Sequence, residues 1–515
     1  MNQLKRDLNR SIRRVSIAVL ILFLILLVNV NYLQAVEAPS LANGQLNDRT
    51  EYDQTQVQRG DIVTQDGVTI AGTKQVKAGL FKYQRTYSNG PVYAPVTGYD
   101  TIFSPSQAPN YATGVERSEY SLLSGTGNQL AFRNFIDMIT DKPQQGARVV
   151  VTINSKAQLA AYQGLEQKLA GVTINGHQQV GGVVAINPST GAILAMASYP
   201  SYDPNQLTVE NTGTAGTLVG KLSAENPSPL INNATQTTLP PGSTFKIVTS
   251  SAWYGQDTTR NPNQKVYSPQ PLKLPNGNLL NDDNNEQCGD GSGHTAVITA
   301  FAESCNTPFA NIGADLGGPT IAATANKFGF NTATDIPGVT VAASQFTAES
   351  DASLTALDAI GQHDTTETPL QEAMVAATVA NGGVLMKPYL IDQVTASDLS
   401  VVQQTQPQVL SRPISPTVAG YEKQMMIAVV QDPDGTGQQY NQSALGGLVI
   451  AGKTGTAQNG QSSQPDAVFT AFAPADNPKI AVGVMIEGGG YGAAAAEPIA
   501  VAVIKAYLDG NTGQG

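Results

Sequence analysis

The chain has 515 residues, enough for two or three domains with a substantial hydrophobic core. Apolar residues make up 41% and charged residues only 13%, with 50 Gly and 30 Pro, which excludes intrinsic disorder and suits a turn-rich folded protein. The net charge is -11, and basic residues cluster only near the N-terminus, so nucleic-acid binding is not expected. Two cysteines and three histidines do not form a usual Cys/His metal site, and we expect neither metal nor cofactor.

The N-terminal segment has the pattern of a membrane anchor. Five basic residues lie between Lys5 and Arg14, and an apolar run follows over 15–33. At about 1.5 Å per residue, this run as a helix just spans a hydrocarbon core of roughly 30 Å, and its basic flank should stay in the cytoplasm. We therefore expect a cytoplasmic tail over 1–14, a transmembrane anchor over 15–33 and an extracellular remainder. A signal peptide cleaved near Ala38 is the alternative, and it would also export the rest.

Residues 34–178 are predicted to form a smaller N-terminal domain of short strands and turns. Asp66-Gly67 lies between two apolar runs and predicts a hairpin. Apolar residues at helical spacing over 158–169 predict a helix.

A second unit is predicted over 179–508. It should open with strands over 182–186 and 192–197, and near its end strands over 468–473 and 480–486 should form a hairpin. A helix over 497–508 and a disordered tail over 509–515 should follow. Strands at both ends with helices between them predict an α+β domain.

The first candidate motif is Ser243-Thr244-Phe245-Lys246, which follows two prolines and a glycine at a predicted helix start. Positions i and i+3 share a helix face, so Ser243 and Lys246 can touch. A serine hydroxyl needs a base to become a nucleophile, and a lysine made neutral by burial can serve. Alone, the pattern also fits an ordinary helix start.

Two further motifs follow along the chain. Ser304-Cys305-Asn306 combines a hydroxyl that can relay a proton with an amide that can hold a substrate carbonyl or a lysine, although it also fits a helix-capping loop. Lys453-Thr454-Gly455-Thr456 could bind a carboxylate and supply an oxyanion-hole N–H. The apolar run over 447–452 is predicted to be a strand that leads into it. A strand end rich in Thr and Gly is the alternative.

In this order, the three motifs are the signature of serine β-lactamases and penicillin-binding proteins. From about Arg59 to about Lys505 the chain resembles class B penicillin-binding proteins, monofunctional D,D-transpeptidases, and within them most the actinobacterial penicillin-binding protein A group. Stretches that support the resemblance are 185–191, 200–205, 360–362, 368–371, 380–383 and 469–474. It implies a non-catalytic pedestal (dimerisation-type) domain over 34–178 and a transpeptidase domain over 179–508, whose antiparallel sheet has helices on both sides.

The resemblance implies a penicillin-sensitive enzyme that cross-links peptidoglycan during growth or division. Ser243 would attack the D-Ala-D-Ala carbonyl of a stem peptide, and Lys246 would be the acylation base. Ser304 and Asn306 would relay protons and position the substrate. The implied partners are stem peptides on glycan made from lipid-linked precursors, β-lactams as inhibitors, and a polytopic membrane glycosyltransferase.

The third motif would complete the site. Lys453 would set its electrostatics, and Thr454 and Thr456 would bind the terminal carboxylate. Gly455 would let the substrate backbone approach. The backbone N–H groups of Ser243 and Thr456 would hold the oxyanion.

The chain departs from the family pattern at three places outside the motifs. Asp466-Ala467-Val468 stands where His-Ala-Trp is expected, and Ala496-Glu497-Pro498 where Ala-Ala-Pro is expected. Asn154 stands where an Asp is usual. These departures affect the cleft wall and the pedestal junction rather than the reaction.

Several other functions use the same motifs. A D,D-carboxypeptidase or endopeptidase uses water in place of the acceptor amine, and the anchored two-domain layout argues against it. A β-lactamase needs a base for deacylation, and a Glu-x-x-Leu-Asn-type stretch is absent from the sequence. A β-lactam sensor would carry several membrane helices, and an inactive division scaffold should have lost the nucleophile.

Cys288 and Cys305 are candidates for a disulfide, because the exported compartment is oxidising. It would tie the loop over 281–293 to the middle motif, although two buried free thiols are the alternative. The loop also holds Asp282, Asp283 and Asp290, which we expect to be solvated acids rather than a calcium site, since no calcium-loop spacing occurs.

Overall fold

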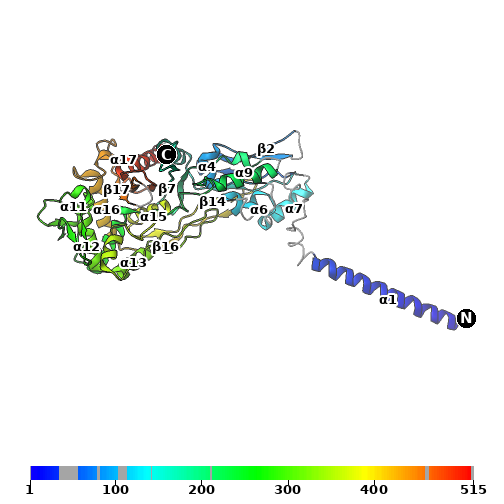
Figure 1. The fold of residues 1–515 in the computed structure, drawn as a ribbon. Coiled ribbons are helices and arrows are strands. Elements are labelled where there is room, and N and C mark those ends of the chain that lie inside the picture. Colours follow the sequence, from blue (N-terminus) through cyan, green and yellow to red (C-terminus); the bar gives the residue numbers. More distant parts are fainter. Residues whose placement is uncertain are drawn as a thin grey trace.

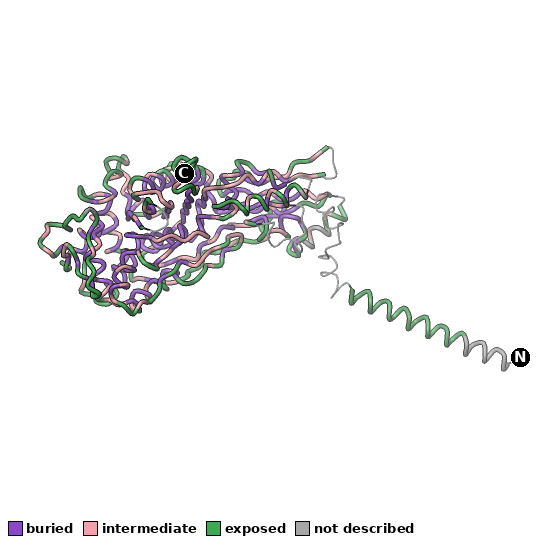
Figure 2. Tube along the Cα trace, in the orientation of Figure 1, coloured by how far each residue is buried: buried purple, intermediate pink, exposed green. Residues whose placement is uncertain are grey.

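The computed structural model describes residues 2–33, 56–77, 82–101, 113–140, 142–208, 212–458 and 463–511. Helix α1 (Asn2–Tyr32) contains both the predicted tail and the predicted anchor, and its part from Ile12 to Tyr32 is long and apolar enough to cross a membrane. Residues 12–33 are all exposed (Figure 2). The possible cleavage site near Ala38 lies outside the described residues.

The C-terminal part is built on an antiparallel sheet of five strands in the order β17-β18-β19-β7-β8. The strands are β7 (Gly181–Ile186), β8 (Ile193–Tyr199), β17 (Ala451–Ala457), β18 (Asp466–Ala473) and β19 (Ile480–Ile486). All residues of β7, β18 and β19 are buried, as expected for a sheet covered on both faces. The predicted α+β architecture, an antiparallel sheet with helices on both sides, is confirmed.

Helices cover this sheet on both faces. On one face lie α8 (Ser155–Leu169) and α18 (Glu497–Asn511), and a Cβ added to Gly181 would lie 2.9 Å from Leu165 of α8. On the other face lies α15 (Pro369–Ala380), so close that a Cβ on Gly483 would lie 2.5 Å from its backbone. Beyond α15 the buried helix α10 (Lys246–Gln256) packs against α12 (Asn306–Leu316), α13 (Gly318–Lys327) and α16 (Pro416–Gln431).

The predicted hairpin over 468–486 is confirmed, since Ala473 of β18 pairs with Ile480 of β19. The strand predicted over 447–452 is correct only at its last two residues, Ala451 and Gly452, which begin β17. Gly446 and Gly447 have φ angles of 64° and 102°, which form a turn, and β17 begins only at Ala451. The tail predicted to be disordered from 509 begins inside α18, which ends at Asn511, and 512–515 lie outside the described residues.

The N-terminal part contains a six-stranded sheet in the order β15-β14-β4-β1-β2-β3. Its strands are β1 (Ile62–Val63), β2 (Thr69–Gln75), β3 (Tyr83–Tyr87), β4 (Arg148–Val151), β14 (Ile391–Thr395) and β15 (Val401–Gln404). The predicted hairpin at Asp66-Gly67 joins β1 and β2 antiparallel. Two strands of this sheet thus come from within the predicted 179–508 domain: β14 pairs with β4 of the N-terminal part, and β15 pairs with β14 (Figure 1).

Candidate active site

The first motif forms the turn η4 (Gly242–Phe245), which feeds directly into α10, and Ser243 is only 9% exposed. Gly242 has a φ of 58°, and a Cβ there would lie 2.7 Å from the carbonyl oxygen of Thr456. Only glycine allows both this backbone conformation and this close approach. The nucleophile turn therefore packs directly against β17, which carries the third motif.

Lys246 is fully buried, and its Nζ donates hydrogen bonds to the carbonyl oxygen of Ser304 at 2.7 Å and to Oδ1 of Asn306 at 2.9 Å. Burial lowers the pKa of Lys246 to about 7, against the opposing charges of Asp283 and Asp282. A neutral amine has two N–H groups and one lone pair. With both N–H groups given to these oxygens, the lone pair is left to accept the proton of Ser243.

Ser304 connects the two motif lysines. It has a φ of 62°, a strained conformation for a residue with a side chain, of the kind found at functional sites. Its carbonyl oxygen accepts from Lys246, while its Oγ accepts from Nζ of Lys453 at 2.8 Å. One residue thus offers an oxygen to each lysine.

The third motif lies within β17, at an edge of the five-stranded sheet. Lys453 is fully buried, and its Nζ also donates to the carbonyl oxygen of Thr454 at 2.9 Å. Burial, followed by the charge of Lys246, lowers the pKa of Lys453 well below its ordinary value. Oγ1 of Thr454 lies 2.6 Å from Oγ1 of Thr436, a partner that no local sequence pattern indicates.

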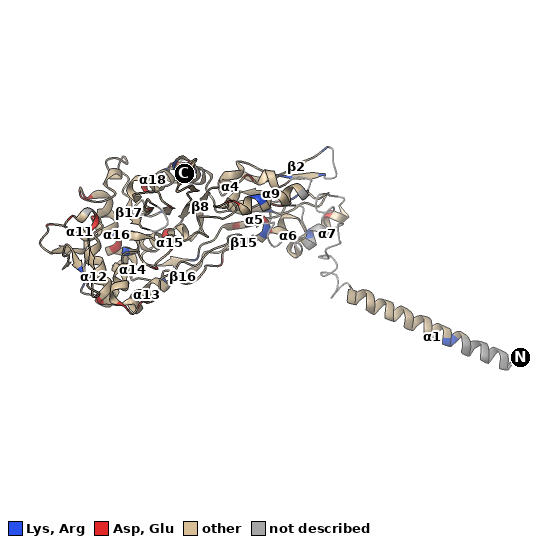
Figure 3. Ribbon diagram, in the orientation of Figure 1, with Lys and Arg blue, Asp and Glu red and all other residues tan. Residues whose placement is uncertain are grey.

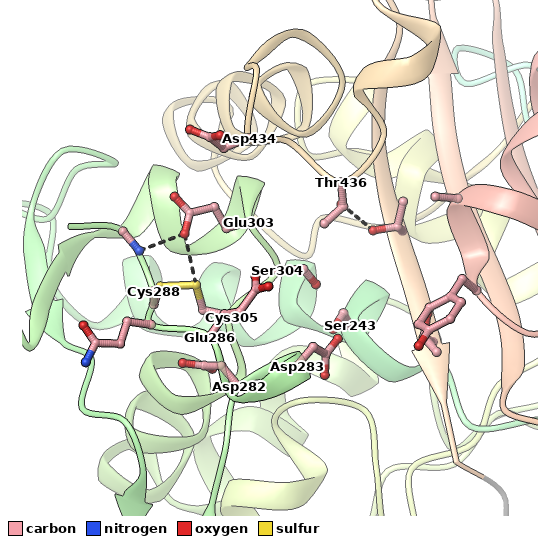
Figure 4. A pocket seen from close by; sticks show the side chains of 16 residues that line it. Ser243, Asp282, Asp283, Glu286, Cys288, Glu303, Ser304, Cys305, Asp434 and Thr436 are labelled. Carbon is pink, nitrogen blue, oxygen red and sulfur yellow. Dashed lines mark hydrogen bonds between the residues drawn. A yellow bond between two sulfur atoms is a disulfide. The ribbon is translucent and has the colours of Figure 1, made fainter. Parts of the chain in front are cut away.

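A cleft with a volume of about 650 Å³ opens over these motifs (Figure 4). The motif residues that line it are Ser243, Ser304, Cys305, Thr454 and Thr456. Acidic residues also line it, namely Asp282, Asp283, Glu286, Glu303 and Asp434. In Figure 3 the ribbon near α11 (Val297–Ala302) contains red segments, which mark acidic residues. The cleft has the size of a small-molecule or peptide-end site, with the two motif lysines buried behind its lining.

The loop over 281–293 is tied to the middle motif. Cys288 and Cys305 are joined by a disulfide, with Cα atoms 5.9 Å apart. The prediction of a solvated Asp282 is wrong, because its carboxylate is buried and accepts the N–H groups of Asn306 and Thr307 at the start of α12. Cys305, the residue before that helix, supplies no side-chain cap, so a distant carboxylate caps the helix in its place.

The residues that depart from the family pattern hold neighbouring backbone. Asp466 begins β18 and accepts the N–H of Gly488 at 2.8 Å, and Asn154 caps α8 by accepting the N–H of Ala157 at 3.0 Å. Glu497 begins α18 and accepts from Nε2 of Gln439 at 3.0 Å.

Comparison with known proteins places the chain among cell-wall enzymes. The penicillin binding protein transpeptidase domain matches residues 181–505, and the penicillin binding protein A dimerisation domain matches residues 59–149. Peptidoglycan D,D-transpeptidase PbpA of Mycolicibacterium smegmatis is 37% identical over 97% of this chain and 99% of its own. That of Mycobacterium tuberculosis is 35% identical over 98% of this chain and 100% of its own.

Solved structures agree with these matches. The ceftriaxone acyl-enzyme complex of penicillin-binding protein A from M. tuberculosis has a TM-score of 0.80 and 34% identity, and covers 89% of this chain and 100% of that one. Its imipenem acyl-enzyme complex has a TM-score of 0.79 and 35% identity, and covers 89% of this chain and 100% of that one.

Proposed function

Because the chain belongs to the penicillin-binding protein transpeptidase family, we propose that it is a membrane-anchored peptidoglycan D,D-transpeptidase that forms an acyl-enzyme on Ser243. The observation that carries the proposal is the pair of buried lysines, Lys246 and Lys453, bonded to two oxygens of Ser304 behind the nucleophile turn. Such an arrangement keeps a base of lowered pKa next to a serine.

In the first half-reaction, Lys246 accepts the Ser243 proton while Oγ attacks the carbonyl of the penultimate D-Ala. The N–H groups of Ser243 and Thr456 stabilise the oxyanion. The C–N bond to the terminal D-Ala then breaks. The nitrogen of that D-Ala takes the proton back from Lys246, and free D-Ala leaves as the amine. Thr454 and Thr456 bind the carboxylate of the leaving D-Ala, and Lys453 sets the electrostatic potential at this carboxylate. Gly455 lets the substrate backbone approach.

In the second half-reaction, the amine of another stem peptide attacks the acyl-enzyme. The amine gives its proton to Lys246 and forms the new amide bond. The ester bond to Ser243 then breaks, and Oγ of Ser243 takes the proton back. Ser304 and Asn306 hold Lys246 in place in both halves. A β-lactam enters by the same attack, but its ring-opened acyl group stays on Ser243.

The proposal includes the membrane arrangement. The basic start of α1 would lie in the cytoplasm, Ile12–Tyr32 would span the membrane and the catalytic cleft would face outward. A polytopic glycosyltransferase in the same membrane would supply the glycan strands that carry the stem peptides.

The test is cross-link formation by the full-length protein in detergent, supplied with a stem pentapeptide donor and a second stem peptide as acceptor. We expect a cross-linked dimer and released D-Ala with the wild type, and neither with Ser243→Ala. Release of D-Ala without a dimer would indicate a carboxypeptidase. The absence of both, with a penicillin bound at Ser243, would indicate a sensor or scaffold.

A further inference from the structure

The loop that precedes the middle motif reaches into the catalytic network. Oδ1 of Asp283 accepts a hydrogen bond from Nδ2 of Asn306 at 3.1 Å. The other end of the same amide, Oδ1 of Asn306, accepts from Nζ of Lys246 at 2.9 Å. Asn306 therefore bridges an acid of the cleft lining and the candidate base.

Only one orientation of the Asn306 amide suits both neighbours. In the observed orientation its oxygen faces the amine of Lys246 and its NH₂ group faces the carboxylate of Asp283. In the flipped orientation two acceptors would face each other at Asp283. The NH₂ group would then face Lys246, where it would repel the protonated amine or occupy the lone pair of the neutral amine. A carboxylate accepts but cannot donate when ionised, so Asp283 selects the orientation.

Asp283 is held in place from both sides of its loop. The preceding residue, Asp282, accepts the N–H of Thr307 at 2.7 Å and its Oγ1 at 3.0 Å. On the other side, the disulfide joins Cys288 to Cys305, the residue before α12. These two attachments fix the carboxylate relative to the amide that it contacts.

We infer that Asp283 is a positioning residue for the acyl-transfer reaction: it fixes the Asn306 amide so that the amide oxygen holds Lys246 for proton transfer from Ser243. The inference rests on the proposed function and deepens it. The sequence predicted a solvated Asp283, and the residue is indeed exposed, but its carboxylate also contacts the middle motif 23 residues away, a contact that no local pattern indicates.

The charges around Lys246 determine the sign of the pH effect. Asp282 and Asp283 face it from the loop and raise its pKa, and Lys453 faces it from β17. Glu372 of α15 faces Lys453 in turn. Removing the charge of Asp283 should therefore lower the pKa of Lys246. Lys246 would then remain neutral, and able to act as a base, at a lower pH than in the wild type.

The test is the second-order rate of acylation by a fluorescent penicillin, measured on the full-length protein in detergent from pH 5 to 9. We expect the acylation rate to rise with pH along an acidic limb and then to reach a plateau. In Asp283→Asn, whose amide oxygen can still accept a hydrogen bond, the midpoint of the acidic limb should move to lower pH by roughly half a pH unit, with little change in the plateau rate. In Asp283→Ala, which frees the Asn306 amide, the plateau should also fall about tenfold. Asp283→Glu should restore most of it.

Asp290→Asn is the matched control, since Asp290 is an acid of the same loop that accepts the N–H of Ser292 at 3.0 Å. It should keep the wild-type profile. Equal thermal unfolding midpoints for all variants would confirm that they fold. A wild-type limb and plateau in Asp283→Ala would overturn the inference while leaving the proposed function intact. A wild type without any adduct at Ser243 would overturn both.

Discussion

Lys246 is fully buried, yet the two groups that accept its hydrogen bonds, the Ser304 carbonyl and the Asn306 amide, are neutral oxygens. Neutral acceptors do not compensate for the desolvation of an ammonium group as a contacting carboxylate would. Burial is the largest cause of the lowered pKa of Lys246, and it outweighs the charges of Asp283 and Asp282, which raise that pKa. These side chains explain why a lysine can serve as the base of a serine nucleophile near neutral pH.

A pH profile follows from this environment. Lys246 is protonated below its pKa of about 7 and cannot accept a proton, so acylation by penicillin should rise as the pH increases through about 7. Lys246→Gln should lower the plateau by roughly 10²- to 10⁴-fold, the usual contribution of a positioned base. Stopped-flow fluorescence with a labelled penicillin measures both effects.

A histidine could also titrate near neutral pH, so His363→Gln serves as the control. His363 lies beside Asp358 at 3.3 Å, outside the catalytic network described above. Its substitution should leave the acidic limb unchanged. If the acidic limb of the acylation rate moves in His363→Gln and stays unchanged in Lys246→Gln, Lys246 is not the base that titrates.

At the scale of elements, the site depends on the nucleophile turn pressing against β17. Gly242→Ala should strain the backbone, since its φ is 58°, and should push the turn from the Thr456 carbonyl, 2.7 Å from the added Cβ. We expect acylation to fall by about tenfold or more, because Ser243 and the oxyanion-hole N–H groups would separate. Rates of acylation on the purified protein test this.

Gly255→Ala provides a matched control within the same helical segment. A Cβ on Gly255 meets nothing within 4 Å, and alanine favours a helix over glycine. Its acylation rate should equal that of the wild type. Equal rates in Gly242→Ala and Gly255→Ala would show that the contact between the turn and β17 does not matter.

The sequence predicted elements best where periodicity is strong. The β18–β19 hairpin and the helix before the first strand of the large sheet follow from apolar pattern and turn residues alone. The first part of the predicted 447–452 strand is not a strand, because Gly446 and Gly447 have positive φ and form a turn before an otherwise strand-like apolar pattern. The motifs identified Ser243 and its lysines, but the roles of Asp282 and Thr436 depend on long-range packing that no local pattern records.

At the scale of the whole molecule, the two parts are joined by shared β-structure. The pairing of β14 with β4 places Val394 opposite Val149, both fully buried, although they are far apart in the sequence. A boundary drawn from composition near residue 178 cannot reveal such a return of the chain. The pairing of β14 with β4 should therefore fix the orientation of the N-terminal part relative to the catalytic part.

Val394→Asp should therefore destabilise both parts together. Burying an unpaired carboxylate costs several kcal/mol, on the order of 3 or more. We expect a lower thermal unfolding midpoint and faster proteolysis between the two parts. Val401→Asp on the neighbouring strand is the control, since Val401 is 58% exposed and should tolerate the change. Equal midpoints for both variants would show that the junction carries little stability.

Whether Ser243 carries the acyl group is tested by the intact mass of the full-length protein after incubation with penicillin. We expect a single adduct that persists for hours, lies on the peptide containing Ser243 and is absent from Ser243→Ala. An adduct that forms equally on Ser243→Ala, or penicillin that is hydrolysed without any lasting adduct, would contradict this expectation.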